Sequence, residues 1–223
     1  MTAVTNTGSE PLPLQDALVI VVDDDAMVRE SLGSLFRSVD RQVALLESAS
    51  ELLAFTFPDV PCCLVLDVRL RGPSGLDLQA KLTQMGAHVP IIFVTGYGDI
   101  PMTVAAMKAG AEHFLSKPFR DQDLLDAVAA ALDKDARRRA RAHRDNALRN
   151  CFGTLTPRET EVMTLATSGL LNKQIADRMS ISEVTVKIHR GQAMRKMRAR
   201  TFAELVLMAE RLGLSPVEPW AHA

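Results

Sequence analysis

At 223 residues the chain is long enough for two domains, and its 47% content of hydrophobic residues can fill their cores. No apolar run approaches the ~20 residues of a membrane span. The N-terminus also lacks the basic region followed by an apolar segment that is typical of signal peptides. We therefore expect a cytoplasmic protein without a membrane partner. The three cysteines have neither CxxC nor Cys/His spacing, which argues against a zinc site and a disulfide framework.

The formal net charge of −1 hides an uneven distribution along the chain. Residues 1–132 hold 9 basic and 17 acidic side chains, whereas residues 133–150 hold 7 and 3, and residues 151–223 hold 10 and 7. An acidic first part and a basic remainder indicate two electrostatic units. A basic unit is compatible with a DNA backbone as partner.

Residues 1–16 lack hydrophobic periodicity, so we expect a flexible leader there. Five strand-like runs then alternate with five helix-like stretches. The expected strands are Ala17–Val22, Val43–Leu46, Cys62–Leu66, Pro90–Val94 and Glu112–Ser116, and the expected helices are Met27–Ser38, Ser50–Phe55, Leu76–Met85, Met102–Ala109 and Gln122–Leu132. This alternation predicts an α/β fold with a five-stranded, doubly wound parallel sheet covered by helices on both faces.

Polar residues follow the predicted strands: Asp23 and Asp24 the first, Asp67 the third, Thr95 the fourth and Lys117 the fifth. Ligands of open α/β sheets bind at the carboxyl ends of the strands, so these residues are expected to converge on one crevice. Three carboxylates repel one another unless a cation joins them, and Mg²⁺ prefers such oxygen ligands. The set therefore predicts an aspartate nucleophile that accepts a phosphoryl group, with Mg²⁺ and Lys117 offsetting the negative charge.

Residues 133–150 contain no Gly or Pro and are rich in basic side chains, which predicts a helical extension that becomes a linker. Its RRRAR core is a candidate DNA contact, although a charge run is usually a solvated helix face.

Helix punctuation is clear after residue 151. Capping residues are expected at four positions: Thr156 with Glu159, Asn172, Ser182, and Thr201 with Glu204. The corresponding helices are expected to end near Gly169, Met179, Arg198 and Gly213. Four short helices with a tight Ser180-Ile181 turn between the second and third predict a helix-turn-helix module.

Helical phase divides the third of these helices into two faces. The predicted core side holds Val186, His189, Ala193 and Met197, and the predicted exposed side holds Val184, Lys187, Ile188, Gly191 and Arg195. Cations, one isoleucine and a glycine suit the acceptors, thymine methyls and close approach of a major groove. The expected DNA contacts are Lys173, Thr185, Lys187, Ile188, Arg190, Gly191 and Arg195. Arg190 lies at the face boundary and is expected to touch phosphate, and the alternative for the whole helix is an ordinary amphipathic surface.

Four segments resemble two-component response regulators of the FixJ/NarL type: VVDDDAMVRESL, VLDVRLRGPSGLDL, IIFVTGYGDIPMTVAAMKAGAEHFLSKPF and LTPRETEVMTLATSGLLNKQIADRMSISEVTVKIHR. The resemblance spans nearly the whole chain. It implies a receiver domain at residues 17–132 with strand order 2-1-3-4-5. A helical linker at residues 133–150 and an all-α, four-helix DNA-binding domain of the LuxR type at residues 151–223 would follow.

The resemblance also implies roles for individual residues. Asp67 would be the phosphoacceptor, and Lys117, ahead of a cis Pro118, would contact the phosphate. The implied Mg²⁺ ligands are Asp23, Asp24, Asp67 and the carbonyl of Arg69, the implied switch pair is Thr95 and Phe114, and the implied dimer surface is Met102, Val104, Met107 and Lys108. For this last group the alternative is that they only cover the sheet.

Two further features concern the loops around Asp67. Arg69 and Tyr97 flank it and are placed to tune the lifetime of the phosphate. Arg71 stands where many similar receivers have proline, with Pro73 two places later. This departure removes no reactive group.

The function implied is that of a transcription factor. A cognate sensor histidine kinase would phosphorylate Asp67, which would promote homodimerisation and promoter binding, with RNA polymerase as a candidate partner and no separate enzymatic activity. An aspartyl-phosphate hydrolase of the haloacid dehalogenase kind is an alternative, but it requires a second acid where this chain has Arg69. A small-molecule-sensing regulator would need an aromatic-lined pocket, and the first half of the chain has one Tyr and no Trp.

Overall fold

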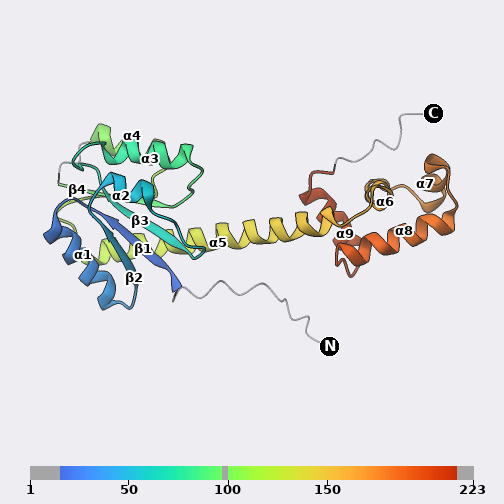
Figure 1. Cartoon of the computed structure of the whole chain (residues 1–223), viewed down its shortest axis with the longest axis horizontal. Coiled ribbons are helices and arrows are strands. Elements are labelled where there is room, and N and C mark those ends of the chain that lie inside the picture. Colours follow the sequence, from blue (N-terminus) through green and yellow to red (C-terminus); the bar gives the residue numbers. More distant parts are fainter. Residues whose placement is uncertain (1–15, 97–99, 215–223) are drawn as a thin grey trace. The chain divides into compact units, whose positions relative to one another are not determined.

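The computed structural model of the chain describes residues 16–96 and 100–214 (Figure 1). Most of the predicted leader and Tyr97 lie outside the described residues. The chain divides into two compact units, Met1–Ala140 and Arg141–Ala223. Of the helices that the structure describes, none combines the length and the apolar character that crossing a bilayer requires.

The first unit alternates strands and helices. Its strands are β1 (Leu18–Val22), β2 (Gln42–Leu46), β3 (Cys62–Asp67), β4 (Ile91–Thr95) and β5 (His113–Ser116), and its helices are α1 (Ala26–Ser38), α2 (Ala49–Ala54), α3 (Gly75–Gln84), α4 (Ile100–Lys108) and the start of α5 (Asp121–Gly153). All four pairings in the described sheet are parallel, in the order β2-β1-β3-β4-β5. The predicted fold and strand order are confirmed.

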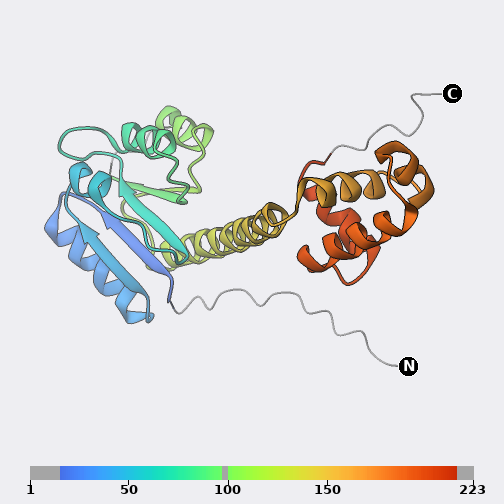
Figure 2. The same cartoon turned by 45° about the vertical axis from the view of Figure 1, so that its right-hand side comes forward.

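Hydrophobic cores cover both faces of this sheet. Ile20, Leu64 and Phe93 pack on one face with residues of α2 and α3, and Val21, Val65 and Ile92 pack on the other with residues of α1 and α5. Figure 2 shows α3 and α4 in green and α1 in blue on opposite sides of the sheet. Every residue of β3 before Asp67 is buried, which is why this strand reads as a continuous apolar run.

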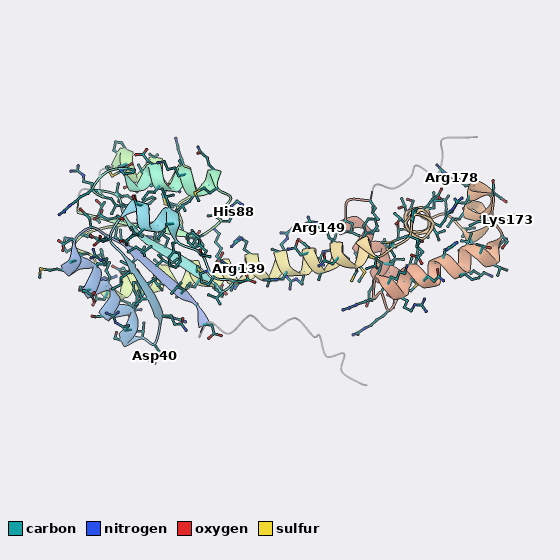
Figure 3. The ribbon with its side chains drawn as sticks, in the orientation of Figure 1. Asp40, His88, Arg139, Arg149, Lys173 and Arg178 are labelled. Atoms are coloured by element: carbon teal, nitrogen blue, oxygen red, sulfur yellow. The ribbon has the colours of Figure 1, made fainter. Side chains whose placement is uncertain are left out.

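The helix α5 continues through the predicted linker, and its first part belongs to the first unit. Asp135 is fully buried and accepts the Cys62 N–H at 3.0 Å, at the start of β3. The guanidinium groups of Arg138 and Arg139 donate to the same carboxylate, each at 2.7 Å, and Figure 3 labels Arg139 at this end of the unit. The division between the units falls after Ala140, inside the predicted linker, so Asp135, Arg138 and Arg139 belong to the first unit.

Replacing Asp135 by Asn is expected to lower the free energy of unfolding of the first unit by about 2–3 kcal/mol, because hydrogen bonds to a buried charge are lost. Urea unfolding followed by circular dichroism measures this. Asp133→Asn is the matched control, since Asp133 lies on the same helix and pairs with Arg137 in a largely exposed ion pair. Equal effects of the two changes would contradict a structural role for Asp135.

In the described part of the second unit, four helices follow the end of α5: α6 (Pro157–Thr167), α7 (Asn172–Met179), α8 (Glu183–Lys196) and α9 (Phe202–Arg211). The predicted capping box is present, since Thr156 Oγ1 accepts the Glu159 N–H at 3.3 Å and Glu159 accepts the Thr156 N–H at 2.7 Å. Ser182 caps α8 as predicted, through the Thr185 N–H at 3.1 Å. Ser180, at φ 53°, turns the chain between α7 and α8.

Two predicted N-terminal caps are wrong in detail. Asn172 does not cap α7, because its side chain accepts a hydrogen bond from Arg190 at 3.3 Å; Leu171 precedes the helix instead. The Glu204 carboxylate accepts the N–H of Arg200 at 2.7 Å, so only the Thr201 half of that capping box forms. The helix α8 ends at Lys196, close to the predicted end near Arg198, whose φ of 58° cannot continue a helix.

Candidate functional site

The carboxyl ends of four strands bring polar side chains together in the first unit. Asp23 follows β1, Asp67 ends β3, Thr95 ends β4 and Lys117 follows β5. Lys117 Nζ donates to Asp23 Oδ2 at 2.8 Å and to Asp67 Oδ2 at 3.3 Å. The Lys117 N–H also donates to the Thr95 carbonyl at 2.7 Å. Residues predicted to converge from separate strands therefore lie side by side.

An acidic cluster surrounds this contact. Asp23, Asp24 and Asp67 each offer a carboxylate oxygen, and these oxygens lie within 4.8 Å of one another. Asp23 is 1% exposed, so its charge is screened little by solvent. Three hard oxygen donors at this spacing fit a divalent cation such as Mg²⁺. The predicted fourth ligand, Arg69, lies beside the cluster, since its N–H donates to Asp67 Oδ1 at 3.0 Å.

The pKa values of Asp67 and Lys117 are both raised, for different physical reasons. Burial raises the pKa of Asp67, although the Arg69 N–H and the Lys117 charge oppose this shift. Burial lowers the pKa of Lys117, but its hydrogen bond to Asp23 and the charge of Asp67 outweigh burial, so this pKa is raised overall. Lys117 is therefore a fixed cation at neutral pH, placed between two carboxylates.

The loop after Asp67 is fitted closely to the strand. A Cβ on Gly75 would lie 2.6 Å from the Asp67 carbonyl oxygen and 3.0 Å from Val68 Cα, both backbone atoms. The Gly75 N–H donates to the Val68 carbonyl at 2.8 Å, which fixes the start of α3 against the end of β3. The sequence analysis assigned no role to Gly75, which directly follows Ser74, the N-cap of α3.

Gly75→Ala is expected to displace the Asp67 backbone and to lower the free energy of unfolding by about 1–3 kcal/mol, as overpacking does. Thermal and urea unfolding measure the effect. Gly96→Ala is the control, because a Cβ at Gly96 meets no atom within 4 Å. Gly96 directly follows Thr95, at the carboxyl end of the neighbouring strand β4. The close fit would be refuted by a Gly75→Ala protein as stable as the control.

The predicted switch and dimer residues lie on β4, β5 and α4. Thr95 is buried at 1% exposure, and the half-buried Phe114 ring lies 6.4 Å from the ring of Phe93. On α4, Met102 packs partly against the core, whereas Val104 and Met107 are 44% and 45% exposed and Lys108 is exposed. The alternative of simple sheet cover therefore fits Met102 and not the other three.

The second unit presents the predicted recognition face. Val186, Ala193 and Met197 are buried and His189 is half-buried, as helical phase predicts. The exposed members of the predicted set are Val184, Lys187, Ile188, Gly191 and Arg195, and Lys173 is exposed on α7 (Figure 3). A surface of small, apolar and cationic side chains thus covers one side of α8.

Two predicted DNA contacts are tied into the protein. Thr185 Oγ1 lies 2.8 Å from Ser182 Oγ at the start of α8. The Arg190 guanidinium lies 4.0 Å from the centroid of the Phe202 ring and donates to Asn172 at 3.3 Å. Arg190 therefore connects α7, α8 and α9, a packing role that helical phase alone did not indicate.

Comparison with known proteins matches both units. The family model of the response regulator receiver domain matches residues 19–129, and that of bacterial regulatory proteins of the luxR family matches residues 153–209. Nodulation protein W of Bradyrhizobium diazoefficiens is 56% identical over 199 residues, covering 89% of this chain and 88% of that protein. Response regulator protein TodT of Pseudomonas putida is 43% identical over 206 residues, covering 92% and 91%. The low-resolution structure of response regulator StyR has a TM-score of 0.82 and 47% identity, covering 88% and 99%.

Proposed function

Since the chain belongs to the two-component response regulators that combine a receiver domain with a LuxR-type DNA-binding domain, we propose that phosphorylation of Asp67 controls its action as a transcription regulator. A sensor histidine kinase is the proposed phosphoryl donor and promoter DNA the proposed target, and the chain is proposed to act in the cytoplasm. The observation that carries this proposal is the contact of Lys117 Nζ with Asp67, 3.3 Å apart, beside two further carboxylates.

The proposed reaction is in-line attack by an Asp67 carboxylate oxygen on the phosphorus of the phosphohistidine, with cleavage of the bond between phosphorus and the imidazole nitrogen. Lys117 holds a positive charge where negative charge on the phosphoryl oxygens gathers. Asp23, Asp24 and Asp67, with the Arg69 carbonyl, would hold Mg²⁺, which when bound neutralises charge on the acids and on the phosphoryl group. The Arg69 N–H keeps the attacking carboxylate oriented.

The proposed switch carries this event to α4. The Thr95 hydroxyl would move to the phosphoryl group, and Phe114 on the neighbouring strand would turn inward into the space vacated. The exposed Val104 and Met107, with Lys108, would then form part of a surface on which two receivers pair. Support comes from the exposure of these side chains and from the pairing of β4 with β5.

Paired receivers would bring two recognition helices to adjacent DNA half-sites. The proposed contacts on α8 are Lys187 and Arg195 to base acceptors or phosphates and Ile188 to thymine methyls, with Gly191 allowing close approach. Lys173, Thr185 and Arg190 would contact the backbone around them, and RNA polymerase is a further proposed partner.

Asp67→Asn is expected to abolish labelling of the chain by radioactive acetyl phosphate in the presence of Mg²⁺, because the amide is not a nucleophile of this kind. Asp126→Asn, which changes an exposed acid on α5, should be labelled like the wild type. Labelling of the Asp67→Asn protein would place the phosphoacceptor elsewhere.

Light scattering in the presence of Mg²⁺ tests the proposed pairing of receivers. Beryllofluoride, a phosphoryl mimic, is expected to double the mass of the wild type and to leave Asp67→Asn monomeric. Val104→Glu and Met107→Glu should remain monomeric with the mimic, because a charge would be buried between the receivers. A mass that never changes in the wild type would remove α4 from the proposal.

Lys187→Ala and Arg195→Ala are expected to weaken binding to promoter DNA by about 1–3 kcal/mol where a base is read. If the replaced side chain contacts only phosphate, its loss should instead lower the slope of the logarithm of the binding constant against the logarithm of the salt concentration by about one. Arg211→Ala is the control, since it removes one cation that pairs with Asp145 at 2.6 Å. Equal losses for all three variants in a titration over several salt concentrations would mean that α8 is not the reading surface.

A further inference from the structure

The acids of the cluster are divided between two cations of the chain. Lys117 contacts Asp23 and Asp67. The third acid, Asp24, pairs with Arg71, whose Nε lies 3.1 Å from Asp24 Oδ2. The Arg71 side chain is 90% exposed and that of Asp24 is 25% exposed, so this pair stands at the open side of the crevice.

The loop that carries Arg71 is anchored at both ends. The Arg69 N–H donates to Asp67 Oδ1 at 3.0 Å, and the Gly75 N–H donates to the Val68 carbonyl at 2.8 Å. Between these anchors Gly72 adopts a φ of 111°, which favours glycine. Arg71 is therefore presented to Asp24 by a loop of defined course, although its own side chain is exposed.

We propose that Arg71 competes with the divalent cation for Asp24 and thereby sets the cation affinity of the unphosphorylated receiver. This inference rests on the proposed metal site. A divalent cation bound to Asp24 and the Arg71 guanidinium on Asp24 Oδ2 repel each other, so each weakens the binding of the other. Lys117 pairs with Asp23 and Asp67, and among the described residues Arg71 is the one cation paired with Asp24, so the competition concerns this single ion pair.

The effect is limited by the exposure of the pair. Exposed ion pairs are weak, so removal of Arg71 is expected to tighten Mg²⁺ binding about two- to fivefold rather than by orders of magnitude. Solvent ions screen such a pair, so the difference should shrink as the salt concentration rises. A lysine at this position keeps the charge and should bind Mg²⁺ nearly as the wild type does.

Isothermal titration of the full chain with Mg²⁺ tests the inference, using wild type, Arg71→Ala, Arg71→Lys and Arg37→Ala. Arg37 is the matched control, because it forms an exposed ion pair with Glu30 at 3.3 Å on α1 and its removal changes the net charge equally. The expected result is tighter binding by Arg71→Ala alone. The Nε–H signal of Arg71 in a nitrogen-15 NMR spectrum is assigned by its absence from the spectrum of Arg71→Lys. In the wild type this signal should shift as Mg²⁺ is added.

Each other result counts against the inference. Unchanged or weaker binding by Arg71→Ala, with normal binding by the wild type, would overturn the role of Arg71 and leave the metal site standing. Equal tightening of Mg²⁺ binding by Arg71→Ala and Arg37→Ala would mean that the change in net charge alone causes it. That result would also overturn the role of Arg71. Failure of the wild type to bind Mg²⁺ would overturn the proposed metal site, and the competition with it.

Discussion

The ammonium group of Lys117 between Asp23 and Asp67 is the interaction on which the first unit's site depends. Asp23 is almost completely buried, and a buried carboxylate without a partner would be costly. Lys117 follows the edge strand β5 and contacts Asp23 after β1 and Asp67 at the end of β3. The carboxyl ends of β1, β3 and β5 must therefore lie at the same level. The parallel topology with β3 in the centre meets this demand, because it places all carboxyl ends on one edge.

The strand β3 is fixed by charged groups at both of its ends. Asp135 accepts the N–H of its first residue, Cys62, and Asp67 at its other end accepts from Lys117. Between them the strand is apolar and buried on both faces. A change in charge at Asp67 therefore acts on an element that cannot shift freely along its axis. The Arg71–Asp24 pair lies beside this end of β3, with the Arg71 side chain 90% exposed and that of Asp24 25% exposed.

The sequence predicted most of this because its signals are local or follow from topology. Alternating apolar runs indicated the sheet, and polar residues after four of the five strands indicated the crevice. Capping failed at Asn172, whose side chain is engaged by a residue 18 positions later, and such a contact has no local signal. The same holds for Asp135 with Cys62, and for Gly75, whose close approach to the Asp67 carbonyl depends on the loop's course. Pairings over long sequence distances are what a single sequence leaves open.

Basic residues in this chain serve two different purposes, and net charge does not separate them. Arg138 and Arg139 of the RRRAR run hold a buried aspartate, Lys196 donates to the buried Glu159 at 2.6 Å, and Arg190 packs on Phe202. The Lys196 hydrogen bond lowers the pKa of Glu159, so this pair is charged and occupied. A cation held in this way would have to break its internal contact to reach a phosphate. Lys173, Lys187 and Arg195 are exposed on α7 and α8, and none of the ion pairs among the described residues engages them. This argument therefore favours them as DNA contacts over Arg138, Arg139 and Arg190.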